Sequence, residues 1–316
     1  MPSITIIGPG ALGLLFAVKL ARCGHGISIL DYREKRAERL NRSGLKLEEE
    51  EEKLTERPLV TISPEELYPK PGYVMVLVKA YQTESILGPL EKIISEKTLV
   101  VSLQNGIGAG EILEKAVPAQ NICLGTTTHG ANLKSENTVR HAGTGPTVIG
   151  PFVPGTSVPE NILSFAGILQ EAGFETQTTG DIYPYLWRKL LVNIGINPLT
   201  ALTGLKNGQL LEDASIRRIQ EMAVSEAFEI IRLGGIDPGM DMDSCLEMVR
   251  NVCRKTAENR SSMLQDRINR RETEIEFITG AVLKKAREMG MQAPVNEVLT
   301  NLITHASRTN WEQFNT

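Results

Sequence analysis

Apolar residues follow different patterns in the two parts of the chain. As far as about residue 180, short apolar runs alternate with segments of helical periodicity; the runs are ITIIG (4–8), ISIL (27–30), YVMVLV (73–78), TLVVSL (98–103) and NICLGT (121–126). Continuous runs of this length suit strands that are buried on both faces of a parallel sheet, with helices crossing between them. The alternation predicts an α/β domain with a Rossmann-type, doubly wound sheet.

The expected crossover helices begin at Ala11, Glu34, Tyr81 and near Glu111. From Asp181 onward the strand signals stop, and long helical periodicities continue almost to the end, for example at 209–235 with its closing glycines. We therefore expect an α/β domain at residues 1–180, followed by an all-helical C-terminal domain at residues 181–316.

A glycine motif comes directly after the first predicted strand. The segment GPGALG (8–13) has G-x-G-x-x-G spacing. In a dinucleotide-binding turn the first glycine permits the tight turn, the second lets the backbone approach a pyrophosphate, and the third lets the helix pack on the strand. An ordinary βα turn is the alternative, but a strand before the motif and a helix after it favour dinucleotide binding. The expected cofactor-binding residues of this loop are Gly8, Gly10, Ala11, Leu12 and Gly13.

The end of the second predicted strand carries opposite charges. Asp31 stands where a carboxylate binds the ribose of NAD, whereas Arg33 could pair with the additional phosphate of NADP. A solvated loop is the alternative for both, and Arg33 opens the basic run REKRAER. We expect NADPH as the cofactor because a guanidinium can bind the phosphate through two hydrogen bonds. NADH stays open because of Asp31.

Two polar clusters follow later strands, at the edge of a doubly wound sheet where ligands bind. They are KAYQT (79–83) and SLQNG (102–106). Lys79, Gln82 and Asn105 are therefore candidates for contacts with a cofactor. A surface lysine at a helix start and a turn-forming Asn-Gly pair are the alternatives.

One helix predicted in the second domain is apolar around most of its circumference, yet it carries a polar stripe. In residues 187–204, Lys189, Asn193 and Asn197 recur every fourth residue and so share one face. Asparagine is a poor helix former, which makes it an unusual choice for a plain solvent-exposed face. An amphipathic helix with two asparagines on its wet side is the alternative. We expect instead that the stripe lines a cleft and contacts a polar ligand.

A second cluster lies near the C-terminus, where SSMLQD (261–266) precedes a helix predicted at 273–290. Glu274 stands in the first turn of that helix, and Gly290 is its expected cap. On the residues alone, Glu274 is expected only to complement the helix dipole.

Composition narrows the classes of partner. The chain has 316 residues, 41% of them hydrophobic, and a net charge of -4, so it offers no excess of cations to a nucleic-acid backbone or an anionic membrane. The four cysteines have no metal-binding spacing. We therefore expect no metal site. We also expect a cytoplasmic protein, because the N-terminus lacks signal-peptide features and charges interrupt every apolar run. A homodimer is left open, and the glutamates from Glu48 to Glu52 are expected to form a solvated hairpin turn.

Together these segments resemble the ketopantoate reductases (2-dehydropantoate 2-reductases). The resemblance rests on GPGALG, LVKAYQT, SLQNGIG, HAGTGPTVIG, WRKLLVNIGINPLTALTG, SSMLQD and TEIEFITG, in the family's order from residue 4 to about residue 295. It implies an NADPH-dependent reduction of ketopantoate to D-pantoate, for pantothenate and coenzyme A synthesis, in a cleft between a Rossmann domain and a helical domain. Many members place an arginine directly at the end of the second strand, where this chain has Asp31 and Tyr32 before Arg33.

The resemblance also implies roles for single residues. Lys189 corresponds to the catalytic acid and Glu274 to an active-site carboxylate, while Lys79 lies beside the cofactor. The implied substrate-binding residues are Asn105, which also meets the nicotinamide, Asn193, Asn197 and Ser262. Burial in such a cleft would lower the pKa of the lysine and make it a better acid for the alkoxide that hydride transfer creates.

Two other functions fit parts of the sequence. A paralogous reductase of another 2-keto acid would keep the polar stripe but have different apolar walls. A non-catalytic NADP-binding sensor needs only the glycine loop, and it gives no reason for the stripe from Lys189 to Asn197.

Overall fold

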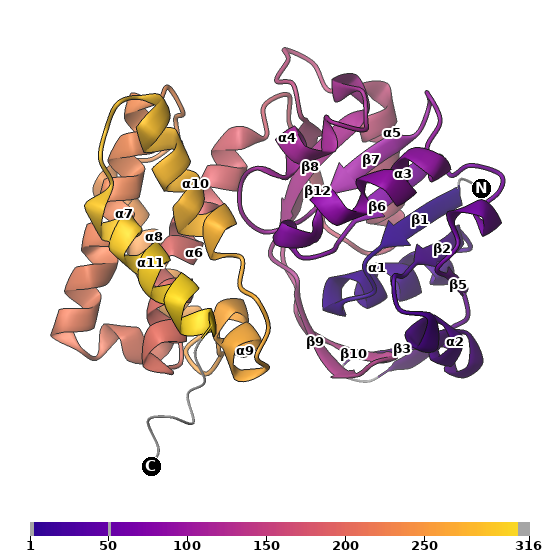
Figure 1. Ribbon diagram of the computed structural model, residues 1–316, viewed down its shortest axis with the longest axis horizontal. Helices are drawn as coiled ribbons and strands as arrows, with labels where there is room; N and C mark the ends of the chain where they lie inside the picture. The colour runs from indigo at the N-terminus through magenta and orange to yellow at the C-terminus, as the bar shows by residue number, and fades with distance from the viewer. Residues whose placement is uncertain (1–2, 50–51, 309–316) are drawn as a thin grey trace. The chain divides into compact units, whose positions relative to one another are not determined.

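The computed structural model describes residues 3–49 and 52–308 (Figure 1). Contacts divide the chain into an α/β unit, Met1–Gln104 with Ala109–Ile182, and a helical unit, Asn105–Gly108 with Tyr183–Thr316. The sequence placed the boundary after residue 180 and assigned Asn105 to the first domain. The α/β unit followed by a helical unit confirms the predicted fold class.

Among the described residues, eight strands of the α/β unit form one large sheet, in the order β12-β11-β8-β7-β6-β1-β2-β5. Their bounds are β1 (Ser3–Ile7), β2 (Gly26–Leu30), β5 (Leu59–Thr61), β6 (Tyr73–Val76), β7 (Leu99–Ser102), β8 (Ile122–Thr127), β11 (Thr147–Pro151) and β12 (Thr176–Thr178). From β5 to β8 all neighbouring strands are parallel, whereas β11 is antiparallel to β8. The carboxyl ends of β1, β2, β6, β7 and β8 therefore meet at one edge.

The helices of the α/β unit are α1 (Ala11–Arg22), α2 (Glu34–Ser43), α3 (Leu87–Ile93), α4 (Ala109–Leu113) and α5 (Glu160–Glu171), with 3-10 turns η1 (Pro64–Glu66), η2 (Ala80–Gln82), η3 (Glu84–Ile86) and η4 (Ala119–Asn121). One core joins α1 and α5 to the sheet, with Phe16 stacked on Phe174 at 4.3 Å. The helix expected from Tyr81 begins only at Leu87. The reason is Pro89, which lacks an N–H donor and is tolerated only in a first turn.

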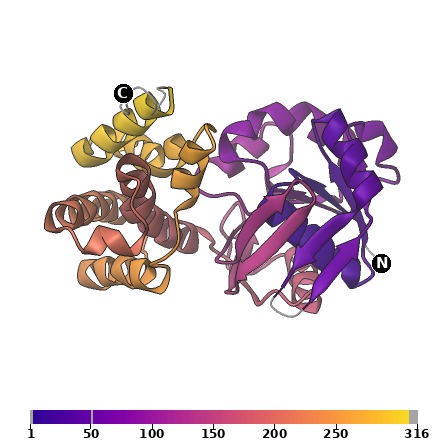
Figure 2. The same cartoon turned by 90° about the horizontal axis from the view of Figure 1, so that it is seen from below.

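A small second sheet, which the sequence did not predict, packs against α1 (Figure 2). Its strands are β3 (Leu45–Glu48), β4 (Lys53–Glu56), β9 (Gly130–Ser135) and β10 (Thr138–Gly143), in the order β4-β3-β10-β9. These strands are half-exposed and lack continuous apolar runs. Strands β3 and β4 are antiparallel and flank the segment predicted as a glutamate turn, of which Glu50 and Glu51 lie outside the described residues.

The helical unit contains α6 (Tyr183–Thr203), η5 (Gly208–Leu211), α7 (Ala214–Leu233), α8 (Met242–Lys255), α9 (Ser262–Ile268), α10 (Ile275–Glu288) and α11 (Pro294–Arg308). Helix α6 contacts all of the other α-helices of this unit and so forms its centre. Helix α7 begins at Ala214 rather than near residue 209, because the Asp213 side chain accepts hydrogen bonds from the backbone N–H groups of Ser215 and Ile216. Within the described ranges, no helix is long and apolar enough to cross a membrane.

Candidate active site

The predicted site residues fall into two sets, one in each unit. The α/β unit holds the cofactor candidates Gly8, Gly10, Ala11, Leu12, Gly13, Asp31, Arg33, Lys79 and Gln82. The helical unit holds Asn105, Lys189, Asn193, Asn197, Ser262 and Glu274.

The three glycines of the loop between β1 and α1 are required for different structural reasons. Gly8 has φ +101°, and a Cβ there would lie 2.6 Å from the Val78 backbone nitrogen. At Gly13, a Cβ would lie 2.2 Å from the carbonyl oxygen of Gly8. At Gly10, in contrast, a Cβ would meet no described protein atom within 4 Å. Packing within the protein therefore explains Gly8 and Gly13, whereas Gly10 fits a backbone that a phosphate group approaches.

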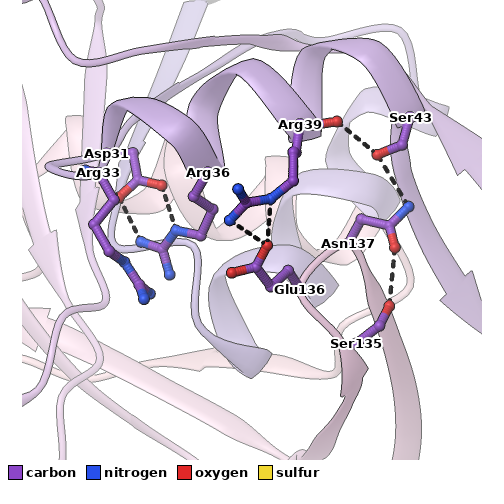
Figure 3. A network of polar contacts seen from close by, with 8 residues as sticks. All are labelled: Asp31, Arg33, Arg36, Arg39, Ser43, Ser135, Glu136 and Asn137. Atoms are coloured by element: carbon purple, nitrogen blue, oxygen red, sulfur yellow. Dashed lines mark hydrogen bonds and ion pairs between the residues drawn. The ribbon is translucent and has the colours of Figure 1, made fainter.

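The end of β2 is occupied by a buried ion pair. The Asp31 carboxylate accepts hydrogen bonds from the Tyr32 N–H at 2.7 Å and from the Arg33 N–H at 3.2 Å. It also binds Nε and Nη2 of Arg36 in a bidentate manner. Figure 3 shows this pair, with the side chain of Arg33 beside it. The sequence did not single out Arg36; its position five residues after an acidic strand end was the available signal.

The cluster after β6 forms a tight connection rather than the start of a long helix. Lys79 precedes η2 and Gln82 ends it, both half-buried, and the Gln82 N–H donates to the Lys79 carbonyl at 2.8 Å. The Gln104 side chain anchors this connection by donating to the Val78 carbonyl at 2.9 Å and to the Thr83 hydroxyl at 2.8 Å. Gly8 packs against Val78, so the segment from Lys79 to Gln82 begins close to the glycine loop.

Asn105 follows β7 in sequence but packs with the helical unit. The Ile107 N–H donates to the carbonyl of Phe277 at 2.9 Å, and Gly106, with φ +89°, lies so close to Phe277 that a Cβ would come within 2.4 Å of that carbonyl oxygen. These contacts place the Asn105 amide beside the first turn of α10. Its Nδ2 lies 3.4 Å from Oε2 of Glu274.

Lys189 and Glu274 form the charged part of the helical set. Lys189 is half-buried on α6, and Glu274 is buried at the N-cap position of α10. Burial lowers the pKa of the Lys189 ammonium to about 8, while the charge of Glu274 acts in the opposite direction. The structure therefore brings together the lysine, the carboxylate and the Asn105 amide.

The two asparagines of the stripe lie on the same helix face as Lys189. Asn197 is only 6% exposed, and Asn193 is half-buried. Within the described part of the chain, neither side-chain amide makes a hydrogen bond to the protein. Because the fold uses neither amide and both keep access to solvent, the stripe is available to a polar ligand.

Ser262 is exposed at the start of α9, and its neighbour Ser261 fixes that helix end. The Ser261 hydroxyl accepts from the Leu264 N–H at 3.1 Å and lies 2.6 Å from the hydroxyl of Thr200 on α6. Ser262 is therefore held next to the helix that carries the stripe. Groups of His, Cys, Asp and Glu that could hold a metal ion are absent from residues 3–49 and 52–308.

Comparison with known proteins identifies the family. The family described as "Ketopantoate reductase PanE/ApbA" matches residues 4–154, and its C-terminal part, "Ketopantoate reductase PanE/ApbA C terminal", matches residues 181–307. The chain belongs to the ketopantoate reductase family. The resemblance seen in the sequence is thereby confirmed over both units.

Two relatives within the ketopantoate reductase family match almost from end to end. The 2-dehydropantoate 2-reductase of Halobacterium salinarum is 34% identical over 96% of this chain and 99% of its own length. That of Archaeoglobus fulgidus is 35% identical over 95% of this chain and 96% of its own. Both are named as reductases, and this chain is likewise an oxidoreductase.

A solved structure of similar fold is D-mandelate dehydrogenase in ternary complex with NADH and anilino(oxo)acetate. It superimposes with a TM-score of 0.90 at 25% identity and covers 97% of this chain and 98% of its own. A ketopantoate reductase-type fold is thus also found in a protein that binds NADH, so the fold does not decide the nicotinamide cofactor.

Proposed function

We propose that this protein reduces 2-dehydropantoate (ketopantoate) to D-pantoate with NADPH, in the synthesis of pantothenate and coenzyme A. Support comes from the family and from relatives of that name at 34% and 35% identity over nearly the whole chain. The observation that carries the proposal is the stripe of α6. There the amide of Asn197, a residue only 6% exposed, makes no hydrogen bond to the described residues and shares a helix face with a lysine whose pKa is lowered.

Lys189 serves as the general acid. NADPH, when bound, supplies the hydride that is added to the keto carbon. The carbonyl oxygen then carries the negative charge, and it takes a proton from Nζ of Lys189, which is left as a neutral amine and regains a proton from water. With a pKa of about 8, the ammonium is still mostly protonated at neutral pH and gives up its proton more readily than an ordinary lysine.

Glu274 and the amides position the reacting groups. The Glu274 carboxylate attracts the ammonium of Lys189 and lies within 3.4 Å of Nδ2 of Asn105. Asn193, Asn197 and Ser262 provide amide and hydroxyl groups for the substrate's carboxylate and hydroxyl. Fixed contacts of this kind hold the keto group in line for hydride addition and proton transfer.

The α/β unit fits a dinucleotide. Gly10 leaves the backbone open to a pyrophosphate at the start of α1, and Arg33 is an exposed cation just beyond β2. Arg33 would bind the 2′-phosphate of NADPH, whereas Asp31 shapes the end of β2 through its bonds to backbone N–H groups. A cytoplasmic location and assembly as a homodimer are part of the same proposal.

A reductase of another 2-keto acid is the second candidate, favoured by the structural similarity to D-mandelate dehydrogenase with its anilino(oxo)acetate ligand. NADPH oxidation followed by near-ultraviolet absorbance, with ketopantoate and a panel of 2-keto acids that includes aromatic ones, separates the two. Ketopantoate should give the highest kcat/KM. Faster reduction of an aromatic 2-keto acid would support the second candidate, and nucleotide binding without any reduction would indicate a sensor.

A further inference from the structure

The carboxylate of Asp31 has no room for a ribose hydroxyl. Its side chain has 0% exposure. Oδ1 accepts from the Tyr32 and Arg33 backbone N–H groups and from Arg36 Nη2 at 2.5 Å, while Oδ2 binds Arg36 Nε. To accept a hydrogen bond from a nucleotide, the carboxylate would have to leave a bidentate partner, the stronger type of charge-assisted contact.

The guanidinium that binds the Asp31 carboxylate belongs to Arg36 on α2. Its side chain is only 10% exposed and reaches back from the first turn of the helix to the end of β2 (Figure 3). The exposed ring of Tyr32 lies 5.3 Å from Cζ of Arg33 and 5.7 Å from Cζ of Arg36. Cation–π contacts of this type favour a fixed position for both guanidinium groups.

The pairing changes the charge that a nucleotide meets at the end of β2. An unpaired carboxylate there accepts from the ribose of NAD and repels the additional phosphate of NADP. Here the charges of Asp31 and Arg36 cancel. The exposed guanidinium of Arg33 therefore gives the end of β2 a net positive charge. A residue arrangement that looks NAD-like in the sequence thus acquires the electrostatics of an NADP site.

We infer that Arg36 is a specificity-determining positioning residue: by binding and burying the Asp31 carboxylate, it prevents an NAD-type ribose contact and lets Arg33 bind the 2′-phosphate of NADP. The inference rests on the dinucleotide site of the proposed function. In this inference Arg36 contacts no substrate and acts through Asp31.

The role of Arg36 can be tested with two nucleotides in the absence of a keto acid. Adenosine 2′,5′-bisphosphate carries the 2′-phosphate and AMP lacks it, so the ratio of their dissociation constants, measured by calorimetry, reports recognition of that phosphate alone. Arg36→Leu should shift the ratio toward AMP by about tenfold or more, because Asp31 is then free and negatively charged. Adding Asp31→Asn to Arg36→Leu should restore most of the wild-type ratio.

Arg39→Leu is the matched control. Arg39 lies on the same helix and pairs with Glu136 at 2.7 Å, with both side chains about half-exposed, so its loss should leave the ratio unchanged. An equal shift in Arg39→Leu would mean that the general charge of α2 matters, and it would overturn the inference. An unchanged ratio in Arg36→Leu, or a double variant without recovery, would do the same.

Thermal unfolding of each variant shows whether it is folded. If Arg36→Leu does not fold, Arg36→Lys keeps the cation but loses the bidentate contact, and it should shift the ratio in the same direction by less; an unchanged ratio contradicts the inference. Wild-type protein that binds neither nucleotide would overturn the proposed cofactor site and the role of Arg36 with it. Preference of the wild type for the 2′-phosphate with no response to Arg36 overturns the inference alone.

Discussion

The carboxylate of Glu274 opposes the effect of burial on the pKa of Lys189. Burial alone would disfavour the ammonium, and the nearby negative charge retains it. The lysine is thereby kept protonated near neutral pH while remaining a better acid than a solvent-exposed lysine. The two residues are far apart in the sequence: Lys189 lies on α6, and Glu274 is the N-cap of α10.

Glu274→Gln should move the pH dependence of the reaction. Removal of the negative charge lowers the pKa of Lys189 further below about 8, so the alkaline limb of kcat/KM, where the general acid loses its proton, should shift to lower pH. Turnover should fall while the melting temperature is retained. Glu276→Gln, an exposed glutamate in the first turn of α10, is the control and should leave the profile unchanged. An unshifted limb in Glu274→Gln would remove this carboxylate from the mechanism.

Asn197→Ala should affect the substrate rather than the fold. Its amide makes no hydrogen bond within residues 3–49 and 52–308, so its loss should raise KM for the keto acid with little change in the free energy of unfolding. Asn296→Ala is the opposite case, since that amide donates to the Ala223 carbonyl at 3.0 Å and to Glu226 at 2.8 Å. It should cost about 1 to 3 kcal/mol of stability and leave KM unchanged. Denaturant titrations and steady-state kinetics on both variants distinguish the roles; a destabilised Asn197→Ala with normal KM would make the stripe structural.

Gly10→Ala and Gly13→Ala should separate ligand binding from folding. A methyl group at Gly10 meets no described protein atom within 4 Å, so the variant should fold normally and bind NADPH more weakly. At Gly13 the methyl group would lie 2.2 Å from the Gly8 carbonyl oxygen, and the α/β unit should lose more than about 1 kcal/mol of stability. Melting temperature and NADPH titration report the two effects. Undiminished NADPH affinity in Gly10→Ala would argue against a pyrophosphate at that glycine.

A buried histidine should make stability depend on pH. Burial, followed by the charges of His141 and Lys19, lowers the pKa of His129 from 6.5 to about 4. Because the folded state holds this histidine neutral, its contribution to stability is complete above pH 6.5 and is lost progressively as the pH falls toward 4, where the unfolded chain takes up the proton. His129→Gln should therefore lose less stability between pH 7.5 and pH 5 than the wild type, in urea titrations. Equal slopes for the wild type and His129→Gln would contradict the assignment.

The strands of the large sheet could be predicted because β1, β2, β6, β7 and β8 are continuous apolar runs buried on both faces. The small sheet could not, since β4 and β9 are half-exposed and carry no such signal. Periodicity within one helix was enough to single out Lys189, Asn193 and Asn197. The proximity of Lys189 to Glu274 depends on how α6 and α10 pack, which no local sequence pattern shows.

The bond between Arg36 and Asp31 was not predicted from the sequence, for a similar reason. A carboxylate at the end of β2 predicts a ribose contact, and only the turn into α2 decides that a guanidinium five residues later binds it instead. Asn105 also differs from the simple expectation, because the Phe277 carbonyl holds the chain after it against α10.

Lys189→Ala tests the central claim most directly. Measured with NADPH and ketopantoate, its turnover should fall by at least about two orders of magnitude, while the melting temperature and the NADPH dissociation constant stay close to wild type. Lys79→Ala is the comparison, because loss of that lysine should mainly weaken cofactor and substrate binding. Near wild-type turnover in Lys189→Ala would contradict the account and leave the polar stripe of α6 as a structural feature.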